Sequence, residues 1–346
     1  MYCDQMQDDY ELLELMVKDS VSAEGIYNPG PYWNSKSQRA LRQIKRVGIS
    51  DFRGRSNSIG VSFTDCEPLD ATLGRGAMKH RIASWVFSLP GLAGMQKAQV
   101  ALARSLSDEK MMWKRVQLAD SARVGDLLAK YLLEDTTRAG CFDTVEVDGQ
   151  TISIWYLSLL DTHDHLAEHI DYTQVRSMLE IGGGFGAYTH LLISNYPNMK
   201  KFLYLDIAPN LYIGTQYLRS HFPGAVRDYR DLRKQDSIRF REDNSLEILC
   251  ITPFQLQEFV GSFDLIHNSR SFVEMPPEVV ANYADISLRS LANGGAITLV
   301  SYDGFDKSTI PPQDLPTFFS VEFERSTMQT LRPGRMDYHF VHKLLT

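Results

Sequence analysis

Cysteine is scarce in this sequence, and the few cysteines present are far apart. The 346 residues include four of them, Cys3, Cys66, Cys141 and Cys250. Small secreted domains are stabilised by a dense set of disulfides, and a zinc ribbon needs closely spaced cysteine pairs. The sequence therefore excludes a disulfide framework and a zinc ribbon, and we expect reduced, structural thiols.

An excess of positive charge is also missing. The chain has 36 Lys and Arg against 43 Asp and Glu, a formal net charge of -7. Binding to a nucleic acid rests on a concentrated basic surface, whereas the basic clusters at 46–55 and 227–234 are both interrupted by acids. We predict no nucleic-acid partner.

Long apolar runs are the third absence. No stretch approaches the roughly 20 apolar residues that cross a bilayer. The N-terminal MYCDQMQDDYELLELM lacks the basic start and apolar centre of a secretory signal. We therefore expect no membrane span and a cytoplasmic location.

After about residue 150, short apolar runs alternate with longer mixed stretches. Buried parallel strands separated by helices give this pattern. The predicted strands are VRSMLEI (175–181), KFLYLDI (201–207), LEILCI (246–251), FDLIHN (263–268) and GAITLVSY (295–302), with helices at 187–196 and 276–293. FFSVEFER (318–325) and MDYHFVHKLL (336–345) flank a turn and predict an antiparallel hairpin. The expected fold is α/β, a doubly wound sheet with a terminal antiparallel hairpin.

The first 150 residues have a different pattern. Amphipathic helices are indicated by YELLELMVKDSV, RALRQIKRV and EKMMWKRVQLADSARVGDLLAKYLLE. In FDTVEVDGQTISIWYL, Asp148 and Gly149 lie between two alternating runs and predict a hairpin. We expect a mainly helical N-terminal cap, a substrate domain, over 1–150 and a cofactor-binding domain over 151–346.

The most informative stretch is SMLEIGGGFGAY (177–188), where an apolar strand ends in a glycine-rich turn before a helix. Such a turn lets backbone approach a ligand closely, and the helix start offers free N–H groups. Gly182, Gly184 and Ala187 fit the dinucleotide pattern G-x-G-x-x-A. Glu180, Gly182, Gly184 and Gly186 fit the acid-x-G-x-G-x-G pattern of an S-adenosylmethionine site. A tight turn without a ligand is the third interpretation.

Two acids separate these interpretations. Glu180 would repel a pyrophosphate but would pair with the ammonium of a methionine moiety. Asp206 ends the next strand, where a carboxylate accepts hydrogen bonds from a ribose diol in either kind of site. The adenine is expected beyond the third strand, near Thr252, Pro253 and Phe254, although a core phenylalanine after a strand is the commoner explanation.

These residues resemble the class I S-adenosylmethionine-dependent methyltransferases, through LEIGGGFG (179–186) and the acid of FLYLDIAP, Asp206. The resemblance covers roughly 170–346. It implies a Rossmann-like methyltransferase sheet, S-adenosylmethionine as the cofactor, and a set of cofactor-binding residues: Glu180, Gly182, Gly183, Gly184, Phe185, Gly186, Asp206, Ile207 and Asn268.

Within that class the chain is similar to the sugar O-methyltransferases. The similar segments are PYWNSKSQRALRQIKRVGISDFRG (31–54), EIGGGFG and FDLIHNSRSFVEMPPEVVANYAD (263–285), with Asn268, Ser271, Glu274 and Met275 at matching spacing. The implied partner is a small-molecule acceptor, a sugar or nucleotide sugar. The sequence leaves homo-oligomer formation open.

Transfer of a methyl group to a hydroxyl needs an aligned acceptor and usually a base. His267, at the end of the fourth predicted strand, is the first candidate, because an imidazole accepts a proton near neutral pH. Glu274 is the second. Each also has a structural interpretation, as a hydrogen-bonded core histidine and as an acid near a helix start.

Residues that could contact the acceptor come from four segments. Tyr32 and Trp33 could stack on a sugar ring, Arg53 and Arg55 could meet a diphosphate, and Arg270 follows the fourth strand. In LLDTHDHLAEHID (159–171), His163 is followed by two further histidines, His165 and His169. This segment could be a metal site, a polar rim of the active site, or a solvated helix start. We predict no metal.

The leading hypothesis is an O-methyltransferase acting on a sugar or sugar-like molecule. Three alternatives stay open: methylation of a non-sugar natural product, a nicotinamide-dependent oxidoreductase, and a cofactor-binding protein without turnover.

Overall fold

The computed structural model describes residues 6–21, 23, 25–27, 30–50, 52–54, 122–133, 136–141, 144–303, 309–331 and 336–344. Its contacts divide the chain into two compact units. Unit 1 comprises 1–8 and 38–161, and unit 2 comprises 9–37 and 162–346. The predicted division at residue 150 stays a prediction, and each unit is described by itself below.

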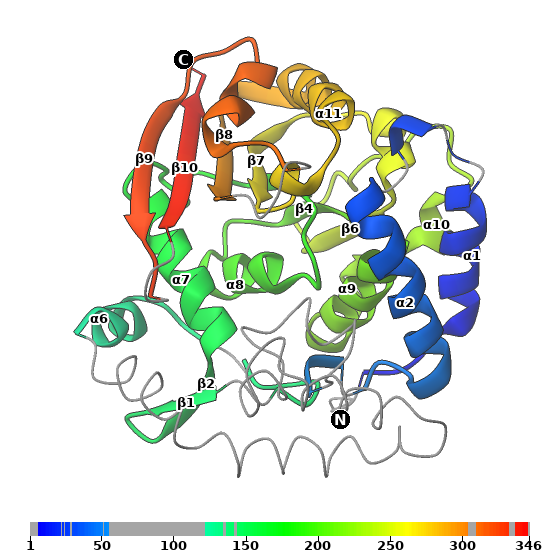
Figure 1. The fold of residues 1–346 in the computed structure, drawn as a ribbon, viewed down its shortest axis with the longest axis horizontal. Helices are drawn as coiled ribbons and strands as arrows, with labels where there is room; N and C mark the ends of the chain where they lie inside the picture. The colour runs from blue at the N-terminus through cyan, green and yellow to red at the C-terminus, as the bar shows by residue number, and fades with distance from the viewer. Residues whose placement is uncertain are drawn as a thin grey trace, which may run out of the picture. The chain divides into compact units, whose positions relative to one another are not determined.

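Unit 2 is built on one eight-stranded sheet in the order β5-β6-β4-β3-β7-β8-β10-β9 (Figure 1). The strands are β3 (Ser177–Ile181), β4 (Lys201–Leu205), β5 (Val226–Arg227), β6 (Glu247–Ile251), β7 (Phe263–Ser269), β8 (Leu291–Tyr302), β9 (Glu324–Gln329) and β10 (Met336–Lys343). All pairs from β5 to β8 are parallel, while β10 is antiparallel to both β8 and β9. The predicted doubly wound sheet with a terminal hairpin is confirmed.

Helices lie on both faces of this sheet. They are α8 (Ala187–Asn195), α9 (Ala208–His221), α10 (Tyr229–Leu232) and α11 (Pro277–Ser290), with short 3-10 helices η5 (Pro253–Glu258), η6 (Phe272–Glu274) and η7 (Pro312–Phe318). Alternate strand residues such as Leu179, Leu203 and Ile266 pack in one apolar cluster with Val280 and Tyr283 of α11. The other face meets α8 and α9, so both faces are buried, which explains the continuous apolar runs.

The strand order places a topological switch point between β3 and β7. The chain passes from β3 to β4 on one side, and later returns to β7 on the other. Ligands of doubly wound folds bind outside the carboxyl ends of the strands at such a point. Glu180 pairs with His267 and Ile181 with Asn268 across it.

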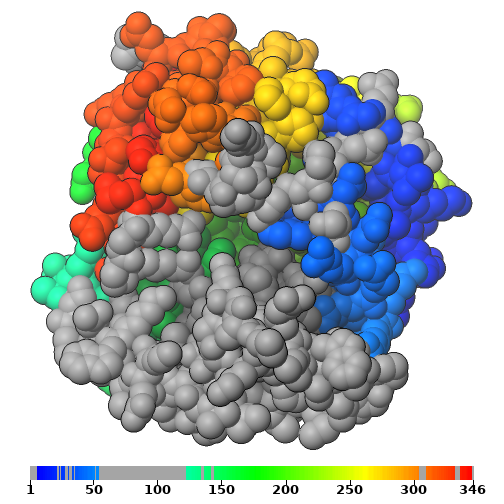
Figure 2. All heavy atoms as spheres, in the orientation of Figure 1, coloured from blue at the N-terminus to red at the C-terminus, as the bar shows by residue number. Residues whose placement is uncertain are grey.

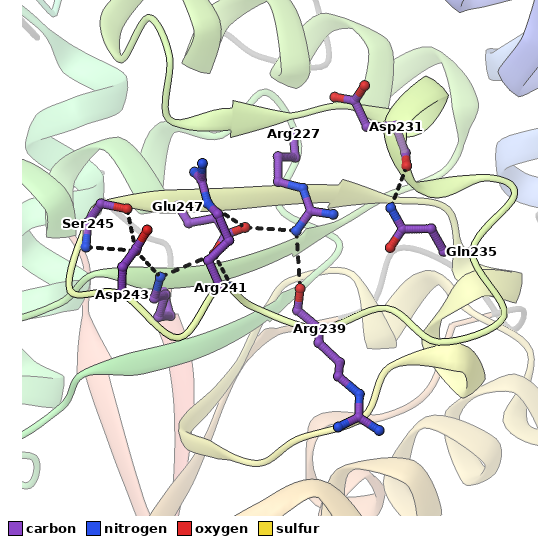
Figure 3. A network of polar contacts seen from close by, with 9 residues as sticks. Arg227, Asp231, Gln235, Arg239, Arg241, Asp243, Ser245 and Glu247 are labelled. Atoms are coloured by element: carbon purple, nitrogen blue, oxygen red, sulfur yellow. Dashed lines mark hydrogen bonds and ion pairs between the residues drawn. The ribbon is translucent and has the colours of Figure 1, made fainter.

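The opposite, amino-terminal edge of the sheet is held by ion pairs. Glu247, fully buried at the start of β6, accepts from Lys201 at 3.2 Å and from Arg227 at 2.8 Å, as Figure 3 shows for Arg227. Burial raises its pKa, but these bonds and one from the Arg241 backbone outweigh burial and hold the pKa of Glu247 below its ordinary value. These bonds fasten the first residues of β4 and β6 to Arg227 of the two-residue β5.

The bounds of the first predicted hairpin strand were wrong. FFSVEFER does not form a strand throughout, because η7 extends to Phe318 and β9 begins only at Glu324. Phe319 packs in the apolar cluster, with Phe323 against it, while β9 itself is largely exposed. An exposed edge strand lacks the apolar alternation that sequence patterns detect.

The N-terminal helices α1 (Tyr10–Val21) and α2 (Pro31–Val47) confirm two predicted helices, with η1 (Gly25–Tyr27) between them. Unit 2 includes α1, η1 and the beginning of α2. The remainder of α2 belongs to unit 1.

Unit 1 contains η2 (Phe52–Gly54), α6 (Ala122–Lys130) and the predicted hairpin, β1 (Thr144–Val147) with β2 (Gln150–Ser153). Asp148 and Gly149 both have positive φ, of 50° and 78°, as this tight turn requires. The run after β2 is not strand, since α7 (Ile154–Ala167) begins at Ile154. Much of the predicted helix at 109–134, and Arg55, lie outside the described residues.

Arg53 is buried in unit 1 and donates to Thr136 O and to Ser153 Oγ. It therefore has a structural role and does not present its guanidinium to a diphosphate. Within the described ranges, no helix is both long and apolar enough to cross a membrane.

Candidate functional site

The glycine loop joins β3 to α8 at the switch point. Gly182, Gly184 and Gly186 all have positive φ, of 73°, 63° and 85°. Gly182 N donates to Leu205 O at 2.8 Å, which ties the loop to the end of β4. A Cβ at residue 182 would lie 2.2 Å from Ser271 Oγ, so both conformation and space require glycine here.

Asp206 holds the loop from the end of β4. Its Oδ2 accepts from Gly184 N at 2.7 Å, and its Oδ1 accepts from Ile207 N at 2.7 Å and from Asn210 Nδ2 at 3.2 Å. A carboxylate has about four acceptor positions, so about one is left for a ribose hydroxyl. Burial raises the pKa of Asp206 to about 7, although the three donors lower it.

Glu180 lies beneath the same loop, since a Cβ at Gly183 would be 2.9 Å from Glu180 Cδ. The carboxyl is buried and accepts a hydrogen bond from Thr189 Oγ1 of α8. Burial raises the pKa of Glu180 to about 8, with a contribution from nearby Asp206. A cation beside these acids would favour their charged forms.

Phe185, the loop residue before Gly186, points inward and is buried against Tyr217 of α9 with ring centroids 5.0 Å apart. Ile207 donates its backbone N–H to Asp206 and begins α9 as the N-cap. The loop residues predicted to bind a cofactor are thus brought together with both acids.

Tyr204 is a loop contact that sequence reasoning missed. Its hydroxyl donates to Gly184 O at 2.5 Å, and its ring packs under Gly183 and Gly214. An aromatic residue inside a buried strand gives no signal that separates this role from ordinary packing.

The predicted adenine residues follow β6. Thr252 is fully buried and caps η5, where its N–H and hydroxyl both donate to Gln255 Oε1 at 3.1 Å. Phe254 is half-buried against Tyr229, with ring centroids 6.3 Å apart. Among the described residues, the buried Gln255 Nε2 has no hydrogen-bond partner. Gln255, which sequence reasoning did not single out, is therefore a donor beside the predicted adenine position.

Asn268 and Ser271 lock β7 to β3. Asn268 Nδ2 donates to Ile181 O at 2.9 Å and to Ser271 Oγ, while its Oδ1 accepts from Phe272 N at 3.2 Å. The side-chain amide of Asn268 is thus used within the protein, and it positions the backbone beneath Gly182.

His267 lies in the core behind the switch point. It stacks on Tyr188 at 4.3 Å between centroids, and its Nδ1 lies 2.8 Å from Thr298 Oγ1. Burial, with smaller contributions from His163 and His339, lowers the pKa of His267 to about 3. A neutral imidazole of such low basicity is a poor proton acceptor, so the geometry agrees with the structural interpretation of His267.

Of the two predicted proton acceptors, Glu274 is the less buried. It ends η6 just beyond β7, is half-buried, and contributes to the raised pKa of Asp206. Its Oε2 accepts from Trp33 Nε1 at 2.8 Å, and its Oε1 accepts from Tyr302 Oη at 2.7 Å. The structure therefore brings the predicted acceptor-binding Trp33 onto the predicted catalytic Glu274, together with Tyr302, which sequence reasoning missed.

Arg270 and His163 are engaged within unit 2. Arg270, a non-glycine residue with φ 62°, pairs with the buried Asp337 of β10 and donates to Thr162 Oγ1 at 3.3 Å. His163 is buried, with Nδ1 3.1 Å from Tyr188 Oη and Nε2 2.7 Å from Tyr196 Oη. His163 is thus part of a buried aromatic network. The interpretation of 159–171 as a solvated helix start was wrong, because α7 begins earlier, at Ile154, and Asp161 and Thr162 are buried inside it.

The described side chains include no group of three or more histidines, cysteines or acids arranged to hold a metal ion. The side chain of Tyr32 lies outside what the structure describes, although its backbone is in α2.

No protein-family model matches the chain, and no curated protein matches it either. Several solved structures are similar. N-methyltransferase NodS from Bradyrhizobium japonicum WM9 has 17% identity and a TM-score of 0.37, over 53% of this chain and 96% of that one. Magnesium protoporphyrin IX methyltransferase from Synechocystis PCC 6803 with bound SAM has 10% identity and a TM-score of 0.37, over 54% and 78%.

PH0226 protein from Pyrococcus horikoshii OT3 has 12% identity and a TM-score of 0.38, over 56% of this chain and 92% of that one.

Proposed function

We propose that this chain is an enzyme, an S-adenosylmethionine-dependent methyltransferase that binds its cofactor against the glycine loop. The carrying observation is the pair of buried acids, Glu180 and Asp206, at the carboxyl ends of neighbouring strands on either side of that loop. Glu180 lies close beneath the loop, since its Cδ would be 2.9 Å from a Cβ at residue 183, and the ring of Tyr204 would be closer still, at 2.5 Å. An acid there suits an ammonium and opposes a pyrophosphate, so it favours S-adenosylmethionine over a nicotinamide dinucleotide.

The proposed residues have distinct tasks. Glu180 would pair with the ammonium of the methionine moiety, and Asp206 would accept from the ribose. Gln255 Nε2, Thr252, Pro253 and Phe254 would surround the adenine. S-adenosylmethionine supplies an electrophilic methyl group on a sulfonium.

We further propose oxygen as the acceptor atom. Glu274 would accept the hydroxyl proton as the new C–O bond forms and the C–S bond breaks, with inversion at the methyl carbon. Trp33 and Tyr302 hold its carboxylate from two sides. Glu274 replaces His267 as the first candidate because it lies half-exposed beyond the strand end, whereas His267 is buried with a pKa of about 3.

The acceptor class is a sugar or sugar-like small molecule. Its support is the spacing of Asn268, Ser271, Glu274 and Met275 together with an aromatic residue, Trp33, beside Glu274. Asn268 and Ser271 themselves bond to the backbone of Ile181, so the side chains proposed to meet the acceptor are Trp33, Glu274 and Tyr302.

The first test is calorimetric titration of the purified chain with S-adenosylmethionine, S-adenosylhomocysteine and NADH in parallel. Saturable binding of the first two alone is expected. Binding of NADH alone would reject the proposal and direct the search to redox substrates.

The acceptor test is methyl transfer to a panel of free sugars, nucleotide sugars and, as controls, phenols and small amines. Methylation confined to the controls would keep the cofactor assignment and reject the sugar.

A further inference from the structure

Residues 9–37 lie within the predicted N-terminal cap but belong to the unit that carries the sheet. This segment comprises α1, η1 and the first turns of α2. Its contacts with the rest of unit 2 lie along one edge of the sheet. The order of these contacts along the chain follows the order of the strands in the sheet.

The first contacts fasten α1 to α9 and α10, which follow β4 and β5. Asp9 pairs with Arg230, 2.5 Å from oxygen to nitrogen, and its backbone N–H donates to Tyr212 Oη at 2.7 Å. Asp19 accepts from Tyr229 Oη at 2.7 Å and pairs with Arg233 at 2.7 Å. One end of the segment is therefore anchored by charged groups.

The next contacts lie beyond β6 and β7. Tyr27 Oη donates to Gln257 Oε1 of η5 at 3.3 Å. Gly30 packs so closely on Pro276 that a Cβ there would be 2.8 Å from Pro276 Cδ. In the space-filling view, N-terminal residues lie directly against those of α11 (Figure 2).

The last contact is the hydrogen bond from Trp33 Nε1 to Glu274 Oε2 at 2.8 Å, with Lys36 Nζ 5.0 Å from the indole centroid. A bond from a neutral donor to a carboxylate is stronger than one between neutral groups. Along the carboxyl edge, the segment thus runs from the β5 side to the switch point between β3 and β7.

We propose that the described residues of this segment, in α1, η1 and the first turns of α2, form a strap over the cofactor edge of the sheet, latched by Trp33 on Glu274, and that the cofactor leaves only when this latch opens. The proposal rests on the proposed function for the identity of the cofactor. It also makes Trp33 a positioning residue, because the carboxylate that would receive the acceptor proton is held from the strap on one side and from β8, by Tyr302, on the other.

The test is the rate at which radiolabelled S-adenosylhomocysteine leaves the full-length protein on dilution into excess unlabelled compound. Trp33→Phe keeps an aromatic ring but loses the N–H, and we expect release about tenfold faster, the equivalent of about 1.4 kcal/mol. Tyr302→Phe is the matched control, since it removes a donor from the same carboxylate without touching the strap. Its release rate should stay within about twofold of the wild type.

A disulfide between the strap and the start of α11 should have the opposite effect on the release rate. Gly30→Cys with Pro276→Cys places two thiols where the strap and the start of α11 are in contact, and oxidation should slow release strongly, with recovery on adding dithiothreitol. Equal release by Trp33→Phe and the wild type, or equal acceleration by Tyr302→Phe, would overturn the strap. A wild type that does not bind S-adenosylhomocysteine at all would instead reject the proposed function.

Discussion

Glu180 and Asp206 are buried carboxyls, and burial determines how they titrate. Their pKa values are raised to about 8 and about 7. A carboxyl whose pKa is higher in the folded than in the unfolded state binds more protons when folded. The free energy of unfolding therefore falls as pH rises from the unfolded value near 4 towards 8.

Asp206→Asn tests this at one position. The variant loses a pH-independent hydrogen bond, but it also loses the cost of a buried charge, about 2 to 3 kcal/mol between pH 5 and pH 8. We expect the Tm of the variant relative to the wild type to be higher at pH 8 than at pH 5, and its affinity for S-adenosylmethionine to be lower. A Tm difference that is the same at both pH values would contradict the assignment.

Residue 182 must be glycine both for its backbone conformation and for lack of space. Gly182→Ala combines a left-handed backbone with a Cβ 2.2 Å from Ser271 Oγ. Gly224→Ala is a matched control, because its φ is 86° and nothing lies within 4 Å of the added Cβ. The conformational cost is roughly 1–2 kcal/mol in both, so denaturant unfolding should show a larger loss for Gly182→Ala, and cofactor affinity should fall only there.

Equal destabilisation of the two variants would show that the loop moves away from Ser271 at little cost. Measuring thermal and denaturant unfolding of both variants in parallel would show whether an equal loss of stability reflects instead a change in the unfolded state.

At the scale of elements, the terminal hairpin brings histidines together against the end of α7. His339 of β10 is buried, its ring is 4.5 Å from that of His165, and neither of its ring nitrogens has a hydrogen-bond partner among the described residues. Burial, together with nearby His165, Arg270 and His169, lowers its pKa to about 3, although Asp337 opposes them.

A histidine with a depressed pKa stabilises the fold fully above the unfolded value near 6.5 and progressively less as pH falls towards 3. At pH 5, the free energy of unfolding lost through this one histidine is on the order of 1–2 kcal/mol. His339→Leu should therefore raise Tm relative to the wild type more at pH 5 than at pH 8. His342→Leu, on the same strand but only partly buried, is the matched control.

The elements also show which features a sequence can predict. Five of the six parallel strands in the described sheet were predicted because burial on both faces makes each a continuous apolar run, whereas the two-residue β5 was missed. The glycine loop with its acids was predicted because it is local in sequence. The start of α7 was missed because a strand-like alternation continues past Ser153 into the helix. The pairing of Trp33 with Glu274 was not predicted, since it joins segments far apart in the chain, and Tyr204 and Tyr302 look like core residues until the sheet is assembled.

At the scale of the whole molecule, the division into units differs from the division that composition suggests. Helical pattern groups 1–150 together, whereas contacts place 9–37 with the sheet. Amphipathic helices look alike whichever surface they cover, and only the tertiary partners of Asp9 and Asp19 distinguish the two arrangements.

The double variant Asp9→Ala with Asp19→Ala tests this division. It removes the carboxylates that α1 directs at Arg230, Arg233 and Tyr229 and leaves the apolar face of α1 intact. Partly exposed ion pairs contribute modestly, so the chain should stay folded while α1 opens more often. Hydrogen exchange measured along the chain should accelerate in α1, α9 and α10 and stay unchanged in the β1–β2 hairpin. Faster exchange in the hairpin, with α9 and α10 unaffected, would place α1 in the cap.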